Sequence, residues 1–217
     1  MQPSHHPDPS TILAFAARTL APAFNIIIAS HLSLCGTCRA AVRAAEALGG
    51  GLVDGLDGAD VSVACRARTM ALLDGATLHR FPAPPAQASD VPAPLAALLA
   101  HVPLGELPWK SKAPGVALCD VPIAGPARGA LLLLRVGSGR AVPDHGHGGE
   151  EMTLVLSGAY RDHLGRFARG DVADIGEDIE HRPVAEDGPD CICLLAMEKP
   201  PRFKSVVARL LQPLIGI

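Results

Sequence analysis

A proline-rich stretch between residues 79 and 94 divides this sequence into two halves with different patterns. Before it, apolar residues recur at the three- and four-residue spacing of helices, and after it short apolar runs are broken by Gly, Pro and Asp. The stretch itself combines Ala and Ser with Pro82, Pro84, Pro85, Pro92 and Pro94, a composition typical of a linker. The sequence therefore predicts an α + β multidomain protein, with a small helical bundle followed by an antiparallel β domain.

The helical half is expected to contain about four helices. Ser10 and Asp60 are candidate N-caps, Pro22 suits the first turn of a helix, and the run from Gly49 predicts a helix end. The expected helices are Thr11–Leu20, Ala23–Leu34, Arg39–Leu48 and Val61–Leu78.

The second half is expected to form an antiparallel sandwich or barrel, because its apolar runs are short and regularly spaced. These runs are Val116–Val121, Ala130–Val136, Thr153–Leu156, Asp171–Ile175 and Asp190–Ala196. The predicted organisation is a helical domain at residues 1–80, a linker at 81–104, a β domain at 105–198 and a C-terminal tail at 199–217.

Composition excludes several classes of protein. With 48% hydrophobic and 19% charged residues the chain is not intrinsically disordered. A net charge of −3 argues against a self-sufficient nucleic-acid binder. The sequence has no apolar run of the ~18–20 residues that a membrane helix needs, and its start lacks the basic and apolar blocks of a signal peptide. We therefore expect a cytoplasmic protein, in which six scattered Cys serve other purposes than a disulfide framework.

The first candidate metal site lies in the helical half. His31, Cys35 and Cys38 are spaced so that all three side chains share one face of a helix or a helix junction. An imidazole and two thiolates are three of the four ligands of a structural zinc site, and His5 or His6 is the candidate fourth. Two alternatives are a redox cysteine pair and two small buried cysteines beside a histidine at a helix end.

The second candidate metal site lies in the β half. His145 and His147 alternate along the chain, Glu151 follows four residues later, and His181 is expected on a facing strand. Three imidazoles and a carboxylate suit a divalent cation such as zinc, iron, manganese or nickel. The alternative is that the histidines belong to a solvated glycine-rich loop.

Two motifs resemble known families. The segment from Gly139 to Gly158 is similar to the first cupin motif, and the second motif keeps Gly170 and His181 but has Gly176, Asp178 and Ala185 at its other marker positions. The pattern of His31, Cys35 and Cys38 with an upstream His resembles the zinc-binding anti-sigma fold. Both motifs in this order are typical of the ChrR-type anti-sigma factors, which the sequence resembles over nearly its whole length.

The resemblance implies a function. It implies an anti-sigma factor whose helical domain binds and inhibits an extracytoplasmic-function (sigma-E-like) sigma factor in a 1:1 complex, without contacting DNA or a membrane. It implies release when the cupin-like domain responds to singlet oxygen or organic peroxide. It also implies a structural zinc held by His6, His31, Cys35 and Cys38, and a second divalent metal, zinc in the first instance, held by His145, His147, Glu151 and His181.

Two further interpretations stay open at this stage. The strongest competitor is a metal-dependent cupin enzyme of the dioxygenase or oxidase kind with an accessory zinc domain, although no second catalytic group is evident, so we expect a regulator. Cys191 and Cys193 alternate on an expected strand and therefore share one face. They are either two small core residues or thiols that take part in signalling.

Overall fold

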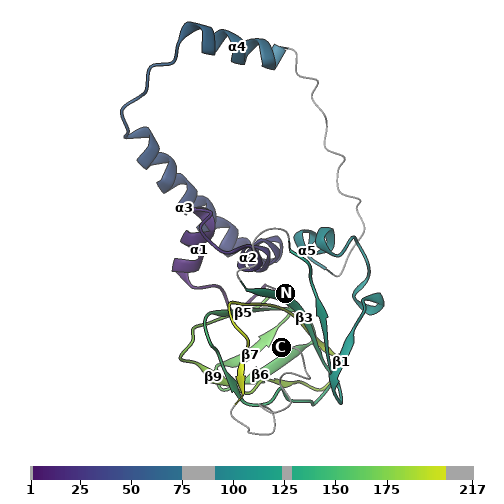
Figure 1. Cartoon of the computed structure of the whole chain (residues 1–217). Helices are drawn as coiled ribbons and strands as arrows, with labels where there is room; N and C mark the ends of the chain where they lie inside the picture. The colour runs from purple at the N-terminus through teal and green to yellow at the C-terminus, as the bar shows by residue number, and fades with distance from the viewer. Residues whose placement is uncertain (1, 75–90, 124–128, 204–217) are drawn as a thin grey trace. The chain divides into compact units, whose positions relative to one another are not determined.

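The structure is a computed structural model that describes residues 2–74, 91–123 and 129–203 (Figure 1). The described residues fall into two compact units, and the division passes through a helix. One unit holds the residues up to Glu46 together with those from Val91 onward, and the other begins at Ala47. The helices are α1 (Pro9–Ala16), α2 (Pro22–Leu34), α3 (Gly36–Asp54), α4 (Val63–Asp74), α5 (Ala93–Leu98) and the short 3₁₀ helix η1 (Leu104–Glu106).

The β half forms an antiparallel barrel-like domain, as the sequence predicts. Its largest sheet has the strand order β1-β2-β3-β11-β5-β8, and two three-stranded sheets have the orders β10-β6-β7 and β12-β4-β9. The strands are β1 (Lys110–Ala113), β2 (Val116–Asp120), β3 (Ala130–Val136), β4 (His145–Gly146), β5 (Glu151–Ser157), β6 (Ala159–Asp162), β7 (Gly165–Ala168), β8 (Val172–Ile175), β9 (Glu180–His181), β10 (Val184–Ala185), β11 (Cys191–Met197) and β12 (Arg202–Phe203).

The central strands β3, β11 and β5 of the six-stranded sheet are buried on both faces, which explains their nearly continuous apolar sequences. Alternate residues of a strand point to opposite faces, and the buried residues accordingly divide into two clusters. In β3, Leu131 and Leu133 pack with the helices, whereas Leu132 packs inside the barrel. In β11, Leu194 belongs to the helix-facing cluster and Cys193 to the barrel interior.

Helices α2 and α5 cover the outer face of this sheet (Figure 1). Ile27, Ile28 and Leu95 have no exposed surface, and burial of one such side chain contributes about 1.5–3 kcal/mol. The front of the chain is therefore packed onto the β half, and this packing places the first metal motif beside the barrel.

The described helices differ from the sequence-based expectation at their ends. α1 begins at Pro9 because Asp8, rather than Ser10, is the N-cap, and the Asp8 carboxylate accepts the Ser10 N–H at 2.8 Å. α3 continues through Gly49–Gly51 to Asp54, since glycine lowers helix propensity without removing the backbone hydrogen bonds. In α4, the Ser62 hydroxyl accepts the Cys65 N–H at 3.1 Å, so Ser62 takes the place expected for Asp60.

The expected linker, residues 81–104, contains ordered and buried structure in its described part. α5 and η1 lie there, and Leu95 and Leu99 belong to the core cluster under α2. Apolar spacing within α5 outweighs the linker-like proline content, because Pro92 and Pro94 sit at the helix start where proline is tolerated. Residues 81–90 lie outside the described residues. So does most of the expected tail, from residue 204.

The second unit, as far as it is described, consists of the end of α3, the following turn and α4. No residue of α4 is buried. The unit exposes apolar side chains along its whole described length, namely Leu48, Leu52, Val53, Leu56, Val61, Val63, Met70, Leu72 and Leu73. We refer to residues 47–74 as the apolar arm.

The described helices were also compared with the dimensions of a bilayer. None of them is by itself long and apolar enough to span one; only α2 and α3 taken together reach that length and composition, and they are bent by 119°.

Candidate metal centres

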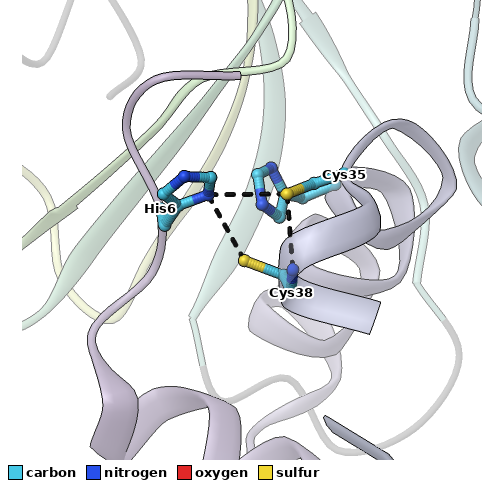
Figure 2. Close-up of side chains that lie close together, drawn as sticks. His6, Cys35 and Cys38 are labelled. Carbon is cyan, nitrogen blue, oxygen red and sulfur yellow. Dashed lines mark hydrogen bonds between the residues drawn. The ribbon is translucent and has the colours of Figure 1, made fainter. Parts of the chain in front are cut away.

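The first cluster forms where three chain segments meet. His31 lies in the last turn of α2, Cys35 is the C-cap of that helix, and Cys38 is in the first turn of α3. His6 comes from the extended segment before α1, and its Nδ1 atom lies 3.5 Å from Cys35 Sγ and 3.4 Å from Cys38 Sγ (Figure 2). We call His6, His31, Cys35 and Cys38 the junction cluster, and one potential ligand atom from each lies within 4.8 Å of the others.

The protonation pattern of the junction cluster suits a cation. His31 Nδ1 lies 2.8 Å from the Gly170 carbonyl oxygen, which can only accept, so Nδ1 carries the hydrogen and Nε2 carries the lone pair. Nε2 is buried without a hydrogen-bond partner in the described structure, and burial lowers the pKa of this histidine. A metal ion supplies the partner that this lone pair lacks.

Both cysteines of the junction cluster are buried. Burial and the neighbouring Cys35 raise the pKa of Cys38 to about 12. A divalent cation has to displace such protons, because the thiolate is the form that coordinates metal. The set of two imidazoles and two thiolates matches a tetrahedral site with ligand distances of about 2.0–2.3 Å.

The structure separates the two N-terminal histidines. His6 belongs to the junction cluster, whereas His5 lies against Phe167 with 4.2 Å between ring centroids. Its Nδ1 atom is 3.7 Å from an oxygen of Asp171. Of the two candidates for the fourth ligand, only His6 is placed to reach the cysteines.

The second cluster lies inside the barrel. Strands β4 and β9 are neighbours, and His145 pairs directly with His181. Glu151 begins β5. His147 directly follows the last residue of β4, so only the first histidine of the motif lies on the strand itself. All four residues are buried. We call His145, His147, Glu151 and His181 the barrel cluster, and their potential ligand atoms again lie within 4.8 Å of one another.

Two lone pairs face each other in the barrel cluster. His145 Nδ1 lies 2.8 Å from the Pro143 carbonyl and His181 Nδ1 lies 2.9 Å from an Asp162 oxygen, so both hydrogens are on Nδ1. The two Nε2 atoms are 3.2 Å apart, and burial lowers the pKa of each ring. Two neutral rings cannot hydrogen bond through two lone pairs, whereas a cation between them is bound by both.

The remaining ligands of the barrel cluster are consistent with this interpretation. His147 Nδ1 is 3.1 Å from a Glu151 oxygen, and its Nε2 is buried without a partner among the described residues. Burial alone would raise the pKa of Glu151, but the hydrogen bond from His147 and the nearby rings lower it below its ordinary value. A carboxylate is therefore available beside three imidazoles, a set that suits zinc, iron, manganese or nickel.

The barrel cluster opens onto a cavity of about 530 Å³. His145, Glu151 and His181 line it together with aliphatic side chains of β2, β3 and β11. Cys191 and Cys193 also line it, both are buried, and their sulfur atoms lie 3.7 Å apart. The hydrogen bond to Cys191, together with burial, raises the pKa of Cys193 well above its ordinary value. The Cys193 thiol is therefore protonated near neutral pH and a weak nucleophile.

Three supporting residues were not identified from the sequence. Asp162 orients His181, the Gly170 carbonyl orients His31, and Asp171 binds the backbone next to His6. Second-sphere carboxylates and carbonyls of this kind fix the tautomer of a ligating histidine. No local spacing marks them, because each lies 19 to 166 residues from its partner.

Comparison with known proteins identifies relatives over the whole length of the chain. Residues 99–199 match the family described as the ChrR cupin-like domain. The anti-sigma-E factor ChrR of Cereibacter sphaeroides is 42% identical over 214 residues, which is 98% of each chain.

Solved structures include a relative that matches both halves. The crystal structure of Rhodobacter sphaeroides SigE in complex with the anti-sigma ChrR is 39% identical, with a TM-score of 0.75 over 89% of this chain and 98% of that one. An RmlC-like cupin protein from Ralstonia eutropha matches 48% of this chain and 71% of its own at 23% identity, with a TM-score of 0.42. The full-length identity, with both clusters in place, shows that the chain belongs to the family of ChrR-type anti-sigma factors.

Proposed function

We propose that this protein is an anti-sigma factor that binds and inhibits an extracytoplasmic-function sigma factor in a 1:1 complex. The observation that carries the proposal is the 42% identity, over 98% of both chains, to an anti-sigma-E factor. A second relative, 39% identical, is named in complex with SigE. The family is one of regulators, which argues against the competing assignment as a cupin enzyme.

The apolar arm is the surface that we assign to the sigma factor. Large exposed apolar side chains are unusual when they are contiguous, and they mark interaction sites. Val63 is 87% exposed and Leu72 75% exposed, so these side chains gain most from burial by a partner. Charge contributes little, since residues 1–85 carry six Arg against five Asp and one Glu.

The large apolar side chains of the helical half fall into two groups. Leu13, Val61, Met70 and Leu73 are exposed, whereas Phe24 is buried and Phe15 and Leu20 pack against the cores. The exposed group remains a set of candidate contacts with the partner. The others stabilise the chain itself.

The junction cluster is proposed to hold a structural zinc. Its four ligands fill a tetrahedral shell and leave no position for a substrate. The metal would fix the angle between α2 and α3, which are bent by 119° with respect to each other.

The barrel cluster is proposed to hold a second divalent metal, zinc in the first instance, with iron, manganese and nickel as alternatives. We further propose that singlet oxygen or organic peroxide acts at this cluster and causes release of the sigma factor. Zinc does not change valence, so the reactive groups would be the ligating imidazoles or the nearby thiols. The adjoining cavity of about 530 Å³ is large enough to admit a small oxidant.

A sigma factor acts with RNA polymerase, so we place the protein in the cytoplasm, without direct contact to DNA or a membrane. The functional boundaries expected from the sequence, with a sigma-binding domain at residues 1–80 and a sensing domain at 105–198, remain predictions.

Co-expression with a candidate sigma factor tests the proposal. Size-exclusion chromatography should show a 1:1 complex, and elemental analysis should show two metal equivalents per chain.

Replacing Leu72 and Leu73 by Asp should reduce the affinity for the sigma factor more than about 30-fold, as expected for central apolar contacts. Leu164→Asp is the control, since Leu164 is 40% exposed but lies between β6 and β7. Full capture by the Leu72/Leu73 variant would exclude the arm as the binding surface.

A further inference from the structure

The β domain holds two of the four junction-cluster residues in place through consecutive residues of one turn. This turn, between β7 and β8, contains Gly170 and Asp171. Asp171 binds the segment that carries His6, and Gly170 binds His31. We call these hydrogen bonds, together with the one from Val172 N–H to the His5 carbonyl, the clasp.

Asp171 is the centre of the clasp. Its Oδ1 atom accepts the backbone N–H groups of Ser4 at 2.6 Å and of His5 at 3.0 Å, and its Oδ2 atom accepts the Ala168 N–H at 2.8 Å. The residue is only 2% exposed. Burial alone would raise the pKa of Asp171, but the backbone donors outweigh that effect and lower it. The carboxylate is therefore ionised at neutral pH and binds its donors strongly.

The Val172 N–H donates to the His5 carbonyl at 3.2 Å. Both backbone groups of His5 are thus bound by the β domain, and His6 is the next residue. Its ring reaches the cysteines from a backbone that the turn has already fixed.

Gly170 contacts His31, the other histidine of the junction cluster. Its carbonyl fixes the tautomer and orientation of His31. Its φ angle is +93°, and a Cβ at this position would lie 3.0 Å from Pro3 and 3.7 Å from Leu34. A side chain here would strain the backbone and push the N-terminal segment away.

The same turn is connected directly to the barrel cluster. Strand β8 starts at Val172 in the clasp and pairs along its length with β5. At the far end of that ladder, Ile175 pairs with Glu151 of the barrel cluster. A shift of β5 or β8 at one cluster therefore reaches the other along four paired residues, without a flexible connection between them.

We propose that Asp171 is a positioning residue that couples the barrel cluster to the junction cluster by fixing the backbone that presents His6. A substitution of a barrel ligand therefore changes, through the clasp, the rate at which the junction cluster loses its metal. The inference rests on the proposed metal binding at both clusters, but it does not depend on the identity of the sigma factor.

Cobalt makes the coupling measurable in the full chain without a partner. The junction cluster contains thiols and the barrel cluster does not, so thiolate-to-cobalt charge-transfer absorption reports on the junction cluster alone. Loss of this absorption to a chelator is timed in the parent protein, in Glu151→Gln, in Asp171→Ala and in the double variant. We expect Asp171→Ala to speed the loss about 10- to 100-fold, the usual effect of removing an outer-sphere partner.

Non-additivity is the diagnostic result. Glu151→Gln should speed loss of junction cobalt at least fivefold when the clasp is intact, in the range of ordinary site-to-site coupling of about 5- to 150-fold. It should change the rate by less than about twofold when Asp171 is Ala. Asp171→Asn, which retains one oxygen for the Ser4 and His5 donors, should restore most of the parent rate.

Two further variants exclude general destabilisation. Asp174→Ala is the matched control, because Asp174 on the same strand also binds the N-terminal segment, through the Asp8 N–H at 3.0 Å and the Thr11 hydroxyl at 2.7 Å. It should leave the rate within about twofold. Ser4→Pro removes a clasp donor without altering the β domain, and it should reproduce the direction of Asp171→Ala.

Strictly additive rates, or equal effects of Asp171→Ala and Asp174→Ala, would overturn the coupling and leave the anti-sigma proposal intact. A full chain that shows no thiolate absorption with cobalt would overturn metal binding at the junction cluster, and the coupling with it.

Discussion

The junction cluster and the barrel cluster offer a metal the same number of side chains but in different settings. The junction cluster contains two thiols and lies where α2 and α3 meet, with His6 as its exposed member. The barrel cluster has no thiol among its ligands, is wholly buried and lines a cavity. The junction cluster connects α2, α3 and the N-terminal segment. The barrel cluster presents its ligands to a cavity that a small molecule can enter. This contrast supports the proposal of a structural role for the first cluster and a sensing role for the second.

The largest effect should follow removal of both junction thiols. Replacing Cys35 and Cys38 by Ser should remove one of two metal equivalents, because the remaining His pair cannot complete a tetrahedral shell. Sigma capture should fall to background, since binding at such sites contributes to folding.

Elemental analysis and co-purification measure the two effects of this double variant. Cys119→Ser is the control, because Cys119 is a free cysteine on β2, outside both clusters and the apolar arm. A double variant that retains both metals and full capture would contradict the structural role of the junction cluster.

Removal of a barrel ligand should give the opposite pattern. His181→Ala should lose the barrel metal and keep the thiolate-bound metal. Its affinity for the sigma factor should change by less than about threefold. Release of the sigma factor in response to oxidant should be reduced. A promoter assay before and after exposure to singlet oxygen measures the response. His163→Ala is the control, because His163 is exposed, directly follows β6 and does not belong to the barrel cluster. Loss of sigma capture in His181→Ala would show that the two clusters do not divide the work in this way.

An intermediate effect is expected from Asp162→Asn. The carboxylate is 1% exposed and accepts the Nδ1 hydrogen of His181 at 2.9 Å. The amide has the same shape as the carboxylate but accepts a weaker hydrogen bond from His181, so the ring is oriented less firmly. The affinity of the barrel cluster for metal should therefore fall about 10-fold, at the lower end of the range for residues that hydrogen bond to a metal ligand. Competition with a chromophoric chelator measures the affinity. An unchanged affinity would mean that the barrel wall alone orients the ring.

Local spacing predicted part of each cluster, and the family resemblance supplied the choice of His6 over His5. A helix places residues four and three apart on one face, which brings His31 together with the two cysteines. The strand pairing of His145 with His181 follows from antiparallel neighbours in a barrel. The eight side chains are therefore grouped as expected, although metal binding itself remains a prediction.

The missed features all depend on contacts between distant parts of the chain. The packing of α2 and α5 on the sheet, through residues such as Ile27 and Leu95, was not predicted. Asp171 meets Ser4 across 167 residues. An isolated Asp at a strand start carries no local signal for such a partner, so neither the clasp nor the docking of α2 could be derived from periodicity.

The smallest predicted effect distinguishes the two N-terminal histidines. His5→Ala removes the ring that lies 4.2 Å from Phe167 and its partly exposed contact with Asp171, but leaves the backbone groups of the clasp. We expect a loss of at most about 1 kcal/mol in the free energy of unfolding, typical of one aromatic contact at a partly exposed site. Both metal equivalents should be retained.

His6→Ala should instead lose the thiolate-to-cobalt absorption of a cobalt-loaded chain, because it removes the ring that reaches both cysteines. The reverse result, with metal lost in His5→Ala and kept in His6→Ala, would exchange the two assignments and move the fourth ligand of the junction cluster by one residue.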